Sequence, residues 1–440
     1  MTDPSAAAES APERITTVPL VAPRDGVPDV VTDERGLDRA AEAVAGGTGP
    51  VAIDAERASG HRYGQRAYLV QVRRAGAGTW LVDPVACPDL RPLDEAIGGA
   101  EWVLHAATQD LPCLAEVGLR PRALFDTELG GRLAGRPRVG LGAMVEHYLG
   151  LQLAKEHSAV DWSTRPLPHP WLLYAALDVE VLLELRDAVA DDLARQGKAG
   201  WAAEEFASLL SFTGPPPRVD PWRRTSGMHR LRSRRGLAIV RELWLLRDRI
   251  AEARDVSPGR VLPDAAIVEL AAAHQRSTTP PRTVSSPDPR LARSIKRHAD
   301  AILEGIARAL AIPEVDLPPL SLPVTGPPPP RTWGDRDPVA AGRLARAREL
   351  VASVSKELAV PAENLLTPDL LRRFLWEAPA APSTQEVAEA LQALGARPWQ
   401  TTITAPLLAL ACEEHPAEAL PATPTSSSSG HFRAPETAQN

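Results

Sequence analysis

The stretch PVAIDAE, residues 50–56, places two carboxylates, Asp54 and Glu56, at the end of an apolar run. In a β-strand, residues two apart point to the same side, so both carboxylates share one face. Two β-rich runs follow, RAYLVQVRR at residues 66–74 and GTWLVDP at residues 78–84. Because Gly and Arg separate these three short runs, the pattern predicts a three-strand antiparallel meander.

Strand and helix patterns alternate after the meander, which predicts an α/β fold with a mixed sheet and flanking helices. Glycine and proline end most of these patterns, and Asp126 has the position of a helix N-cap. The expected elements are a helix at about 88–98, a strand in EWVLHA (101–106), a helix in TQDLPCLAEVG (108–118), a short strand in ALF (123–125), a helix in DTELGGRLAG (126–135) and a long helical region at 168–196.

Proline-rich stretches divide the rest of the chain, which has 44 prolines in all. DVSPGRVLPDAAIVEL (255–270) resembles AVPAENLLTPDLLRRF (359–374), and this similarity suggests a duplicated helical module. The expected organisation is a disordered segment at 1–35, an α/β domain at 36–212, an Arg/Pro-rich linker at 213–236, a helical domain at 237–312, a Pro-rich linker at 313–336, a second helical domain at 337–413 and a disordered tail at 414–440.

Composition excludes several classes of protein. Hydrophobic content of 44% and charged content of 24% are ordinary for a globular chain. The three cysteines are far apart, so they form neither a zinc motif nor a disulfide framework, and a reducing cytoplasm fits best. No signal peptide or membrane span is expected, and no protein partner is evident. The net charge of −7 says little about nucleic acid, so charge has to be examined locally.

Three further side chains extend the acidic pattern. Asp110 lies in the first turn of a helix, where the helix dipole alone would favour an acid. Tyr174 and Asp178 are four residues apart on a helix, so hydroxyl and carboxylate share one face. Taken singly, each acid fits an exposed turn, a helix terminus or a solvated helix face. Their order along the chain is what makes the combination specific.

That order resembles the DEDD superfamily of 3′–5′ exonucleases, in the tyrosine subclass that includes ribonuclease D. The resemblance rests on DAE (54–56), HAATQD (105–110) and YAALDV (174–179), with FDTELGGRLAG and DWSTRPL as further similar segments. Trp171 departs from the family, which usually has Gln three residues before the tyrosine. Beyond this domain, residues 243–271 resemble the HRDC domain, and the second helical domain resembles its repeat in ribonuclease D.

The resemblance implies a ribonuclease-H-like α/β exonuclease domain followed by two small all-α domains, and a metal-dependent activity on RNA 3′ ends. Asp54, Glu56, Asp110 and Asp178 would hold two divalent cations, Mg²⁺ or Mn²⁺, and Tyr174 would orient the attacking water. The implied substrates are structured RNAs such as tRNA precursors, and the products are nucleoside 5′-monophosphates. Two alternatives stay open: a DNA exonuclease of the same superfamily, and a non-catalytic nucleic-acid-binding protein.

Arginines are the candidates for phosphate contacts. Arg165, in DWSTRPL, precedes the helix that carries Tyr174, and a surface salt bridge is its alternative role. Residues 217–236 hold seven arginines and one aspartate, so this run could follow a phosphate backbone or form a solvated basic face. The residues chosen from it as substrate-binding are Arg230, Arg232, Arg234 and Arg235.

Overall fold

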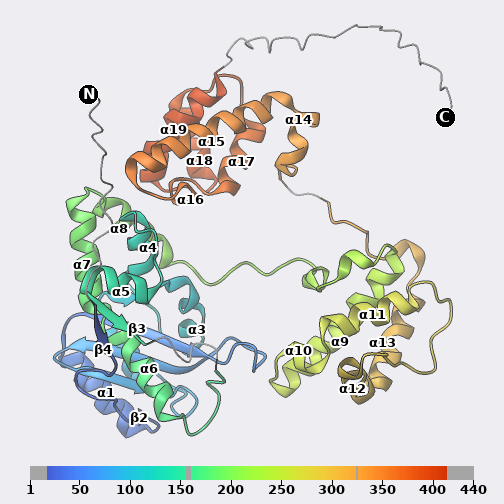
Figure 1. The fold of residues 1–440 in the computed structure, drawn as a ribbon, viewed down its shortest axis with the longest axis horizontal. Helices are drawn as coiled ribbons and strands as arrows, with labels where there is room; N and C mark the ends of the chain where they lie inside the picture. Colours follow the sequence, from blue (N-terminus) through green and yellow to red (C-terminus); the bar gives the residue numbers. More distant parts are fainter. Residues whose placement is uncertain (1–16, 155–159, 324–325, 414–440) are drawn as a thin grey trace, which may run out of the picture.

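The computed structural model describes residues 17–154, 160–323 and 326–413. These residues form an α/β domain followed by two helical modules (Figure 1). The predicted disordered tail, and residues 1–16 of the predicted N-terminal disordered segment, lie outside the described residues. The α/β fold with a mixed sheet and the all-helical C-terminal part are confirmed.

A six-stranded mixed sheet forms the centre of the α/β domain. The three central strands pair antiparallel as predicted, and the outer strands pair parallel to their neighbours. Their order is β2-β5-β4-β3-β6-β7. The strands are β2 (Val30–Val31), β3 (Thr48–Arg57), β4 (Ala67–Ala75), β5 (Gly78–Val82), β6 (Trp102–Leu104) and β7 (Leu124–Asp126).

The expectation of disorder before residue 36 is wrong for residues 17–35. β1 (Val18–Leu20) pairs with β8 (Leu151–Leu153), and β2 pairs with β5 at the edge of the main sheet. These strands have two or three residues each, too few to show an alternating pattern. Partners far away in the sequence stabilise them.

The helices of the domain pack around the sheet. Asp126 caps α4 (Thr127–Leu133) by accepting hydrogen bonds from the backbone N–H groups of Glu128 and Leu129. The long helical region at 168–196 is two helices, α6 (His169–Glu180) and α7 (Leu182–Arg195), and α6 packs across β3, β4 and β5. The others are α1 (Glu34–Gly46), α2 (Arg91–Ile97), α3 (Leu111–Glu116), α5 (Leu141–Leu149) and α8 (Ala199–Leu209).

The two helical modules repeat one succession of helices. In the first, α9 (Arg234–Arg254), α10 (Pro258–Val261) and α11 (Asp264–His274) follow one another. In the second, α15 (Pro338–Leu358), α16 (Ala362–Leu365) and α17 (Pro368–Glu377) each begin 104 positions later. The suggested duplication therefore agrees with the structure. The modules are completed by α12 (Pro289–Arg297) and α13 (Ala299–Ala311), and by α14 (Trp333–Arg336), α18 (Thr384–Ala393) and α19 (Pro398–Cys412).

Both predicted linkers contribute to a module. Trp222 is buried in the core of the first module, and Ser233 caps α9 by accepting from Gly236 N. Trp333 is fully buried in the second module, where its ring lies 4.9 Å from that of Trp376. Each module therefore begins earlier than the proline content suggests.

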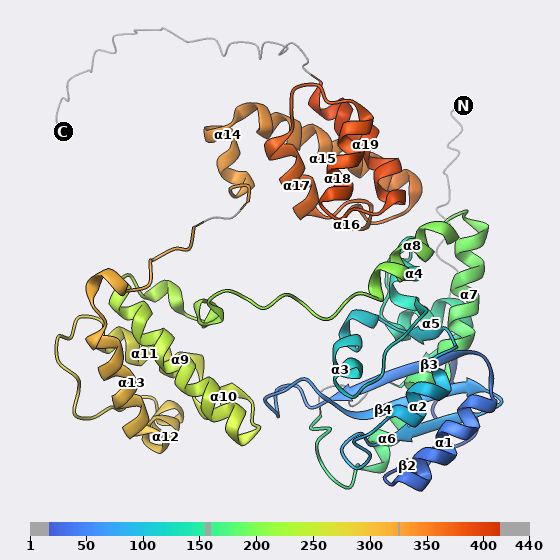
Figure 2. The same ribbon diagram turned by 180° about the vertical axis from the view of Figure 1, so that it is seen from behind.

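The first module contacts the α/β domain through the loop between β3 and β4 (Figure 2). The Tyr63 hydroxyl donates to Asp248 at 3.1 Å, and Ser257 N donates to the carbonyl oxygen of His61 at 3.1 Å. This loop begins two residues after Glu56. The contact therefore holds the first module beside the end of the strand that carries the acidic pair.

The second module packs against α8. Trp201 and Trp399 stack at 5.0 Å with an interplanar angle of 15°, and Trp399 Nε1 donates to buried Glu205 at 3.0 Å. Lys198 Nζ donates to the carbonyl oxygens of Leu133 and Leu358, which joins α4 to α15. Aromatic stacking and satisfied buried donors are typical of a stable interface.

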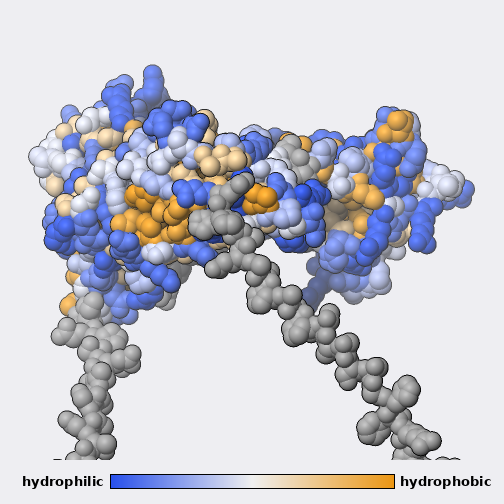
Figure 3. All heavy atoms as spheres, turned by 90° about the horizontal axis from the view of Figure 1, so that it is seen from above, coloured by the Kyte–Doolittle hydropathy of each residue, from blue (hydrophilic) through white to orange (hydrophobic). Residues whose placement is uncertain are grey.

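The visible surface from above is mostly hydrophilic, including the part formed by the first module on the right (Figure 3). Among the described residues, no helix has the length and apolar character needed to cross a bilayer.

Candidate active site

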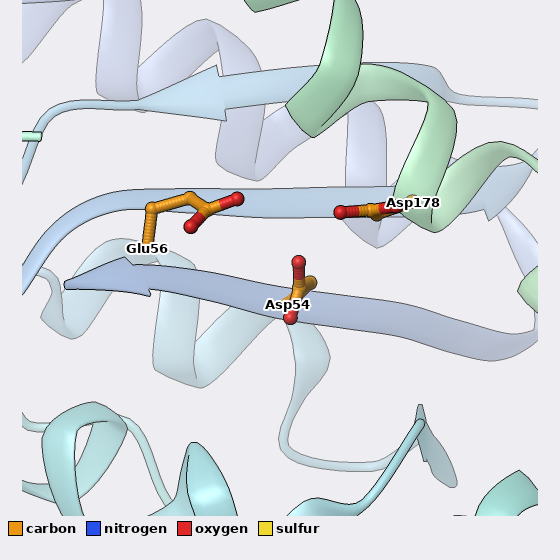
Figure 4. A group of neighbouring side chains, drawn as sticks. All are labelled: Asp54, Glu56 and Asp178. Carbon is orange, nitrogen blue, oxygen red and sulfur yellow. The ribbon is translucent and has the colours of Figure 1, made fainter. Parts of the chain in front are cut away.

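Three carboxylates converge on one point of the α/β domain. Asp54 and Glu56 come from β3 and Asp178 comes from α6, and each offers an oxygen within 4.8 Å of the others. Their carboxylates point toward a common centre (Figure 4). They line a cavity of about 580 Å³, together with the predicted residues Asp110 and Tyr174.

The acidic pair lies inside the strand and not beyond its end. β3 runs to Arg57, and its pairing with β4 is regular from Val51 to Glu56, with register shifts before Val51 and after Glu56. The strand therefore keeps Asp54 and Glu56 on one face, and pairing with β4 holds the backbone at both residues. The sequence pattern, which placed both acids in a strand through Glu56, agrees with the end of β3 to within one residue.

Asp110 lines the same cavity but is not one of the three acids whose oxygens lie within 4.8 Å of one another. Its carboxylate is 3.6 Å from Arg57 Nη2, and it makes no cap hydrogen bond to α3. Helix capping therefore does not explain this buried acid. Arg57 offsets part of the repulsion between Asp110 and Asp54.

Burial and mutual repulsion dominate the electrostatics of the cluster. Burial raises the pKa of Asp54, and it raises the pKa of Glu56, Asp110 and Asp178 well above the usual range. The charge of Asp54 adds to the rise at the other three acids. The charge of Asp54 therefore affects the protonation of each of the other three acids.

Tyr174 is held between the carboxylates and an aromatic group. Burial and the charges of Asp178, Glu56 and Asp54 keep its pKa above the ordinary value, so its hydroxyl remains protonated. The hydroxyl interacts with Asp178, one helical turn away. Its ring lies 6.5 Å from that of Trp162, which makes an edge contact with Trp171 at 5.6 Å. Trp171, which stands where the family usually has Gln, therefore belongs to the aromatic group that packs beside Tyr174.

The donor set fits hard divalent cations. In the described parts of the chain, none of Asp54, Glu56 and Asp178 forms an ion pair with a basic side chain. Clustered acids without a compensating cation are costly, and oxygen ligands are those that Mg²⁺ and Mn²⁺ prefer. The residues present would therefore hold such ions.

His105 has a structural role beside the acidic cavity. Its Nδ1 lies 2.8 Å from the hydroxyl oxygen of Thr127, which itself donates to the Leu104 carbonyl oxygen at 3.1 Å. Burial lowers the pKa of His105 to about 4. The folded protein therefore keeps this imidazole neutral.

Lowering the pH should reduce the free energy of unfolding, because His105 is buried in its neutral form. Its pKa falls from 6.5 in the unfolded reference to about 4 in the fold, so stability is lost as pH falls from the first value toward the second. His105→Gln, which cannot titrate, should remove up to roughly 3 kcal/mol of that loss. Urea unfolding at a series of pH values measures it. If the free energy of unfolding falls equally with pH in the wild type and in His105→Gln, the lowered pKa of His105 is wrong.

The prediction that Arg165 contacts a phosphate is wrong on geometry. Its guanidinium donates to both carboxylate oxygens of Asp83 and to the carbonyl oxygens of Trp162, Thr164 and Tyr68. These bonds use all five N–H donors that an arginine has. Arg165 therefore fastens the DWSTRPL loop to β4 and β5.

The Arg-rich run needs a similar correction. Arg234 donates to the carbonyl oxygens of Val315, Leu317 and Pro318. Arg235 donates to three carbonyl groups at the end of α13. Both are therefore structural. Arg230 and Arg232 are exposed and remain candidates for substrate contact.

The sequence contained a basic helix that the prediction overlooked. All four cations of α12 are exposed and, among the described residues, none forms an ion pair. Burial lowers the pKa of His298, just after α12, and the charges of Arg254 and Arg297 lower it further. The sequence signal that could have identified this basic helix is the run PRLARSIKR, which contains no acid. The four cations are Arg290, Arg293, Lys296 and Arg297.

Three protein families match the chain. The 3′–5′ exonuclease family matches residues 28–194, the HRDC domain residues 236–306 and the 3′ to 5′ exonuclease C-terminal domain residues 326–412. Ribonuclease D of Jannaschia sp. is 34% identical over 61% of this chain and 71% of that protein. Ribonuclease D of Gluconacetobacter diazotrophicus is 32% identical over 61% of this chain and 68% of that protein.

Solved structures resemble the whole fold. A protein from Bifidobacterium adolescentis is 38% identical with a TM-score of 0.78, covering 90% of this chain and 99% of the other. Escherichia coli RNase D, described as an exoribonuclease involved in structured RNA processing, is 25% identical with a TM-score of 0.61. That match covers 83% of this chain and 98% of the other.

Proposed function

Because the chain belongs to the ribonuclease D family of 3′–5′ exoribonucleases, we propose that it trims structured RNA, including tRNA precursors, by metal-dependent hydrolysis. The observation that carries the proposal is the convergence of Asp54, Glu56 and Asp178 within 4.8 Å, with Asp110 and Tyr174 in the same cavity. Nucleoside 5′-monophosphates are the proposed products.

Each residue has a role in this chemistry. The four acids hold the divalent ions, Mg²⁺ or Mn²⁺, which supply Lewis acidity for phosphodiester hydrolysis when bound. The protonated hydroxyl of Tyr174 orients the water that attacks the terminal phosphorus. The bond between phosphorus and the 3′ oxygen of the preceding nucleotide breaks, and that oxygen takes up a proton.

The preference for RNA over DNA rests on the family and on the description of the Escherichia coli protein. A contact to the 2′-hydroxyl would supply this preference. Hydrolysis of matched RNA and DNA strands separates the proposed activity from that of a DNA exonuclease.

A single assay tests the proposal. RNA labelled at its 5′ end is incubated with the protein in Mg²⁺, in Mn²⁺ and in EDTA. A ladder that shortens from the 3′ end with either ion and stops in EDTA supports the proposal. Binding without cleavage in both ions would instead support the non-catalytic alternative.

We assign RNA affinity outside the cavity mainly to α12, because the acidic cluster itself repels a polyanion. Replacing Arg290, Arg293, Lys296 and Arg297 by Ala should lower the slope of log K against log salt by up to about 3, at roughly 0.7 per phosphate contact. Affinity for structured RNA should fall, while hydrolysis of a dinucleotide should not. Filter binding at several salt concentrations measures the slope.

Arg372 and Arg373 provide the matched control for α12. Both form ion pairs with Asp369 on α17, so this one carboxylate offsets half of their combined charge. Replacing them by Ala should lower the slope by much less than the α12 variant does. An unchanged slope for the α12 variant would mean that this helix is only a solvated basic face.

A further inference from the structure

Gln71 is a polar residue in the middle of the sheet without a hydrogen-bond partner. It lies on β4 between β3 and β5 and is 0% exposed. Neither Nε2 nor Oε1 of its side chain has a hydrogen-bond partner among the described residues. A buried amide without partners is unfavourable, and an apolar residue of similar size would pack there at lower cost.

The strand register places Gln71 beside the acidic cluster. Gln71 lies directly opposite Asp54 in the antiparallel pair of β3 and β4. Directly opposite residues point to the same face, with Cβ atoms about 5 Å apart. On the other side of Gln71 lies Leu81 of β5. The carboxamide therefore lies next to Asp54 in one row across the sheet.

Helix α6 covers this row. Leu69 and Leu81, the neighbours of Gln71 along and across the sheet, pack with Ala175 of α6 in one buried cluster. Asp178, one turn later on α6, brings its carboxylate within 4.8 Å of that of Asp54. The next residue of β4 on this face, Arg73, is already bonded to Thr79 and paired with Glu180. The acid directly opposite Gln71 is therefore Asp54, whose carboxylate lies within 4.8 Å of that of Asp178.

We propose that Gln71 is a positioning residue: when the divalent ion is bound, its amide N–H donates to the Asp54 carboxylate and orients that carboxylate toward the ion. The inference rests on the proposed function, because it assumes that Asp54 is a metal ligand. A carboxylate that binds a metal needs donors for its remaining oxygen lone pairs, and such partners fix its orientation. An amide provides this donor without adding charge to a site that is already repulsive.

The test uses the full chain and measures Mn²⁺ affinity by isothermal titration calorimetry without RNA. Gln71→Met keeps the volume and removes the donor, so Mn²⁺ affinity should fall by about 10- to 100-fold. Thermal unfolding in EDTA should not occur at a lower temperature, because the variant removes an unpaired buried amide. Leu81→Met, in the same row but on the far side of Gln71, is the matched control and should bind Mn²⁺ like the wild type.

The outcomes separate the inference from the function on which it rests. If Asp54→Asn weakens Mn²⁺ binding and Gln71→Met does not, Gln71 only fills space. If Asp54→Asn leaves Mn²⁺ binding unchanged, the metal site itself is wrong and the inference falls with it. A crystal structure of the wild type with Mn²⁺ gives an answer independent of any variant. Gln71 Nε2 should lie at about 2.7–3.2 Å from an Asp54 oxygen, and a longer distance overturns the proposal.

Discussion

Asp54→Asn is expected to abolish RNA hydrolysis, leaving only the rate that the wild type shows in EDTA. Asp54 offers an oxygen within 4.8 Å of both Glu56 and Asp178, and its charge raises the pKa of Glu56, Asp110 and Asp178. The amide of Asn keeps the shape but is a neutral and weaker ligand for a hard cation. Degradation of 5′-labelled RNA in saturating Mg²⁺ measures the effect.

Folding and charge controls make this result specific. Asp178→Asn should behave in the same way, because it removes another member of the cluster. Asp161→Asn changes the same charge in the loop before α6, where Asp161 bonds to Ser163, and should keep activity. The Asp54 variant should unfold in EDTA at a temperature no lower than the wild type, since it relieves repulsion. Wild-type rates from Asp54→Asn would show that the acids do not hold the metal.

The features that could be predicted from sequence are those with a local signal. Short β-rich runs separated by Gly and Arg predicted the β3, β4 and β5 meander, because this signal lies within each segment. The two-residue period of a strand placed Asp54 and Glu56 on one face. Their convergence with Asp178 required more than local pattern, because α6 begins more than 100 residues later and only the resemblance connected them.

The features that could not be predicted depend on partners far along the chain. Arg165 looked available for phosphate because its main partner, Asp83, lies 82 residues away. Arg235 belongs to a basic run, yet its donors are used by carbonyl groups 74 to 77 residues further on. A count of arginines measures charge but not how many donors remain available. Helix α12 shows the opposite case: it has four cations against the seven arginines of the basic run, and in the described part of the chain none of the four forms an ion pair.

The unpaired amide of Gln71 was also invisible to sequence reasoning. Within LVQV a single Gln looks like an ordinary interruption of an apolar strand. Only the strand pairing, which places Gln71 opposite Asp54, and the packing of α6 over this row show that the amide lies beside a carboxylate. Buried polar residues opposite known site residues are therefore worth examining once strand pairing is known.

Tyr174→Phe is expected to lower the turnover number by about 10²- to 10⁴-fold with little change in substrate affinity. The hydroxyl is held beside Asp178, and its raised pKa keeps it protonated, so it can act as a donor to the attacking water. Phe keeps the ring that lies 6.5 Å from Trp162, so the packing of α6 should be preserved. Single-turnover hydrolysis of a short RNA, together with equilibrium binding in Ca²⁺, separates the two effects.

Tyr148 offers a matched control for the loss of a hydroxyl. Its hydroxyl donates to Asp192 at 2.7 Å, which makes it a second Tyr–Asp pair in the same domain, outside the cavity. Tyr148→Phe should therefore affect stability but not turnover. If Tyr174→Phe hydrolyses RNA at the wild-type rate and binds it more weakly, Tyr174 contacts the substrate and does not orient water. A loss of turnover shared by both variants would point to a general effect of hydroxyl removal on the domain, because only one of the two residues lines the acidic cavity.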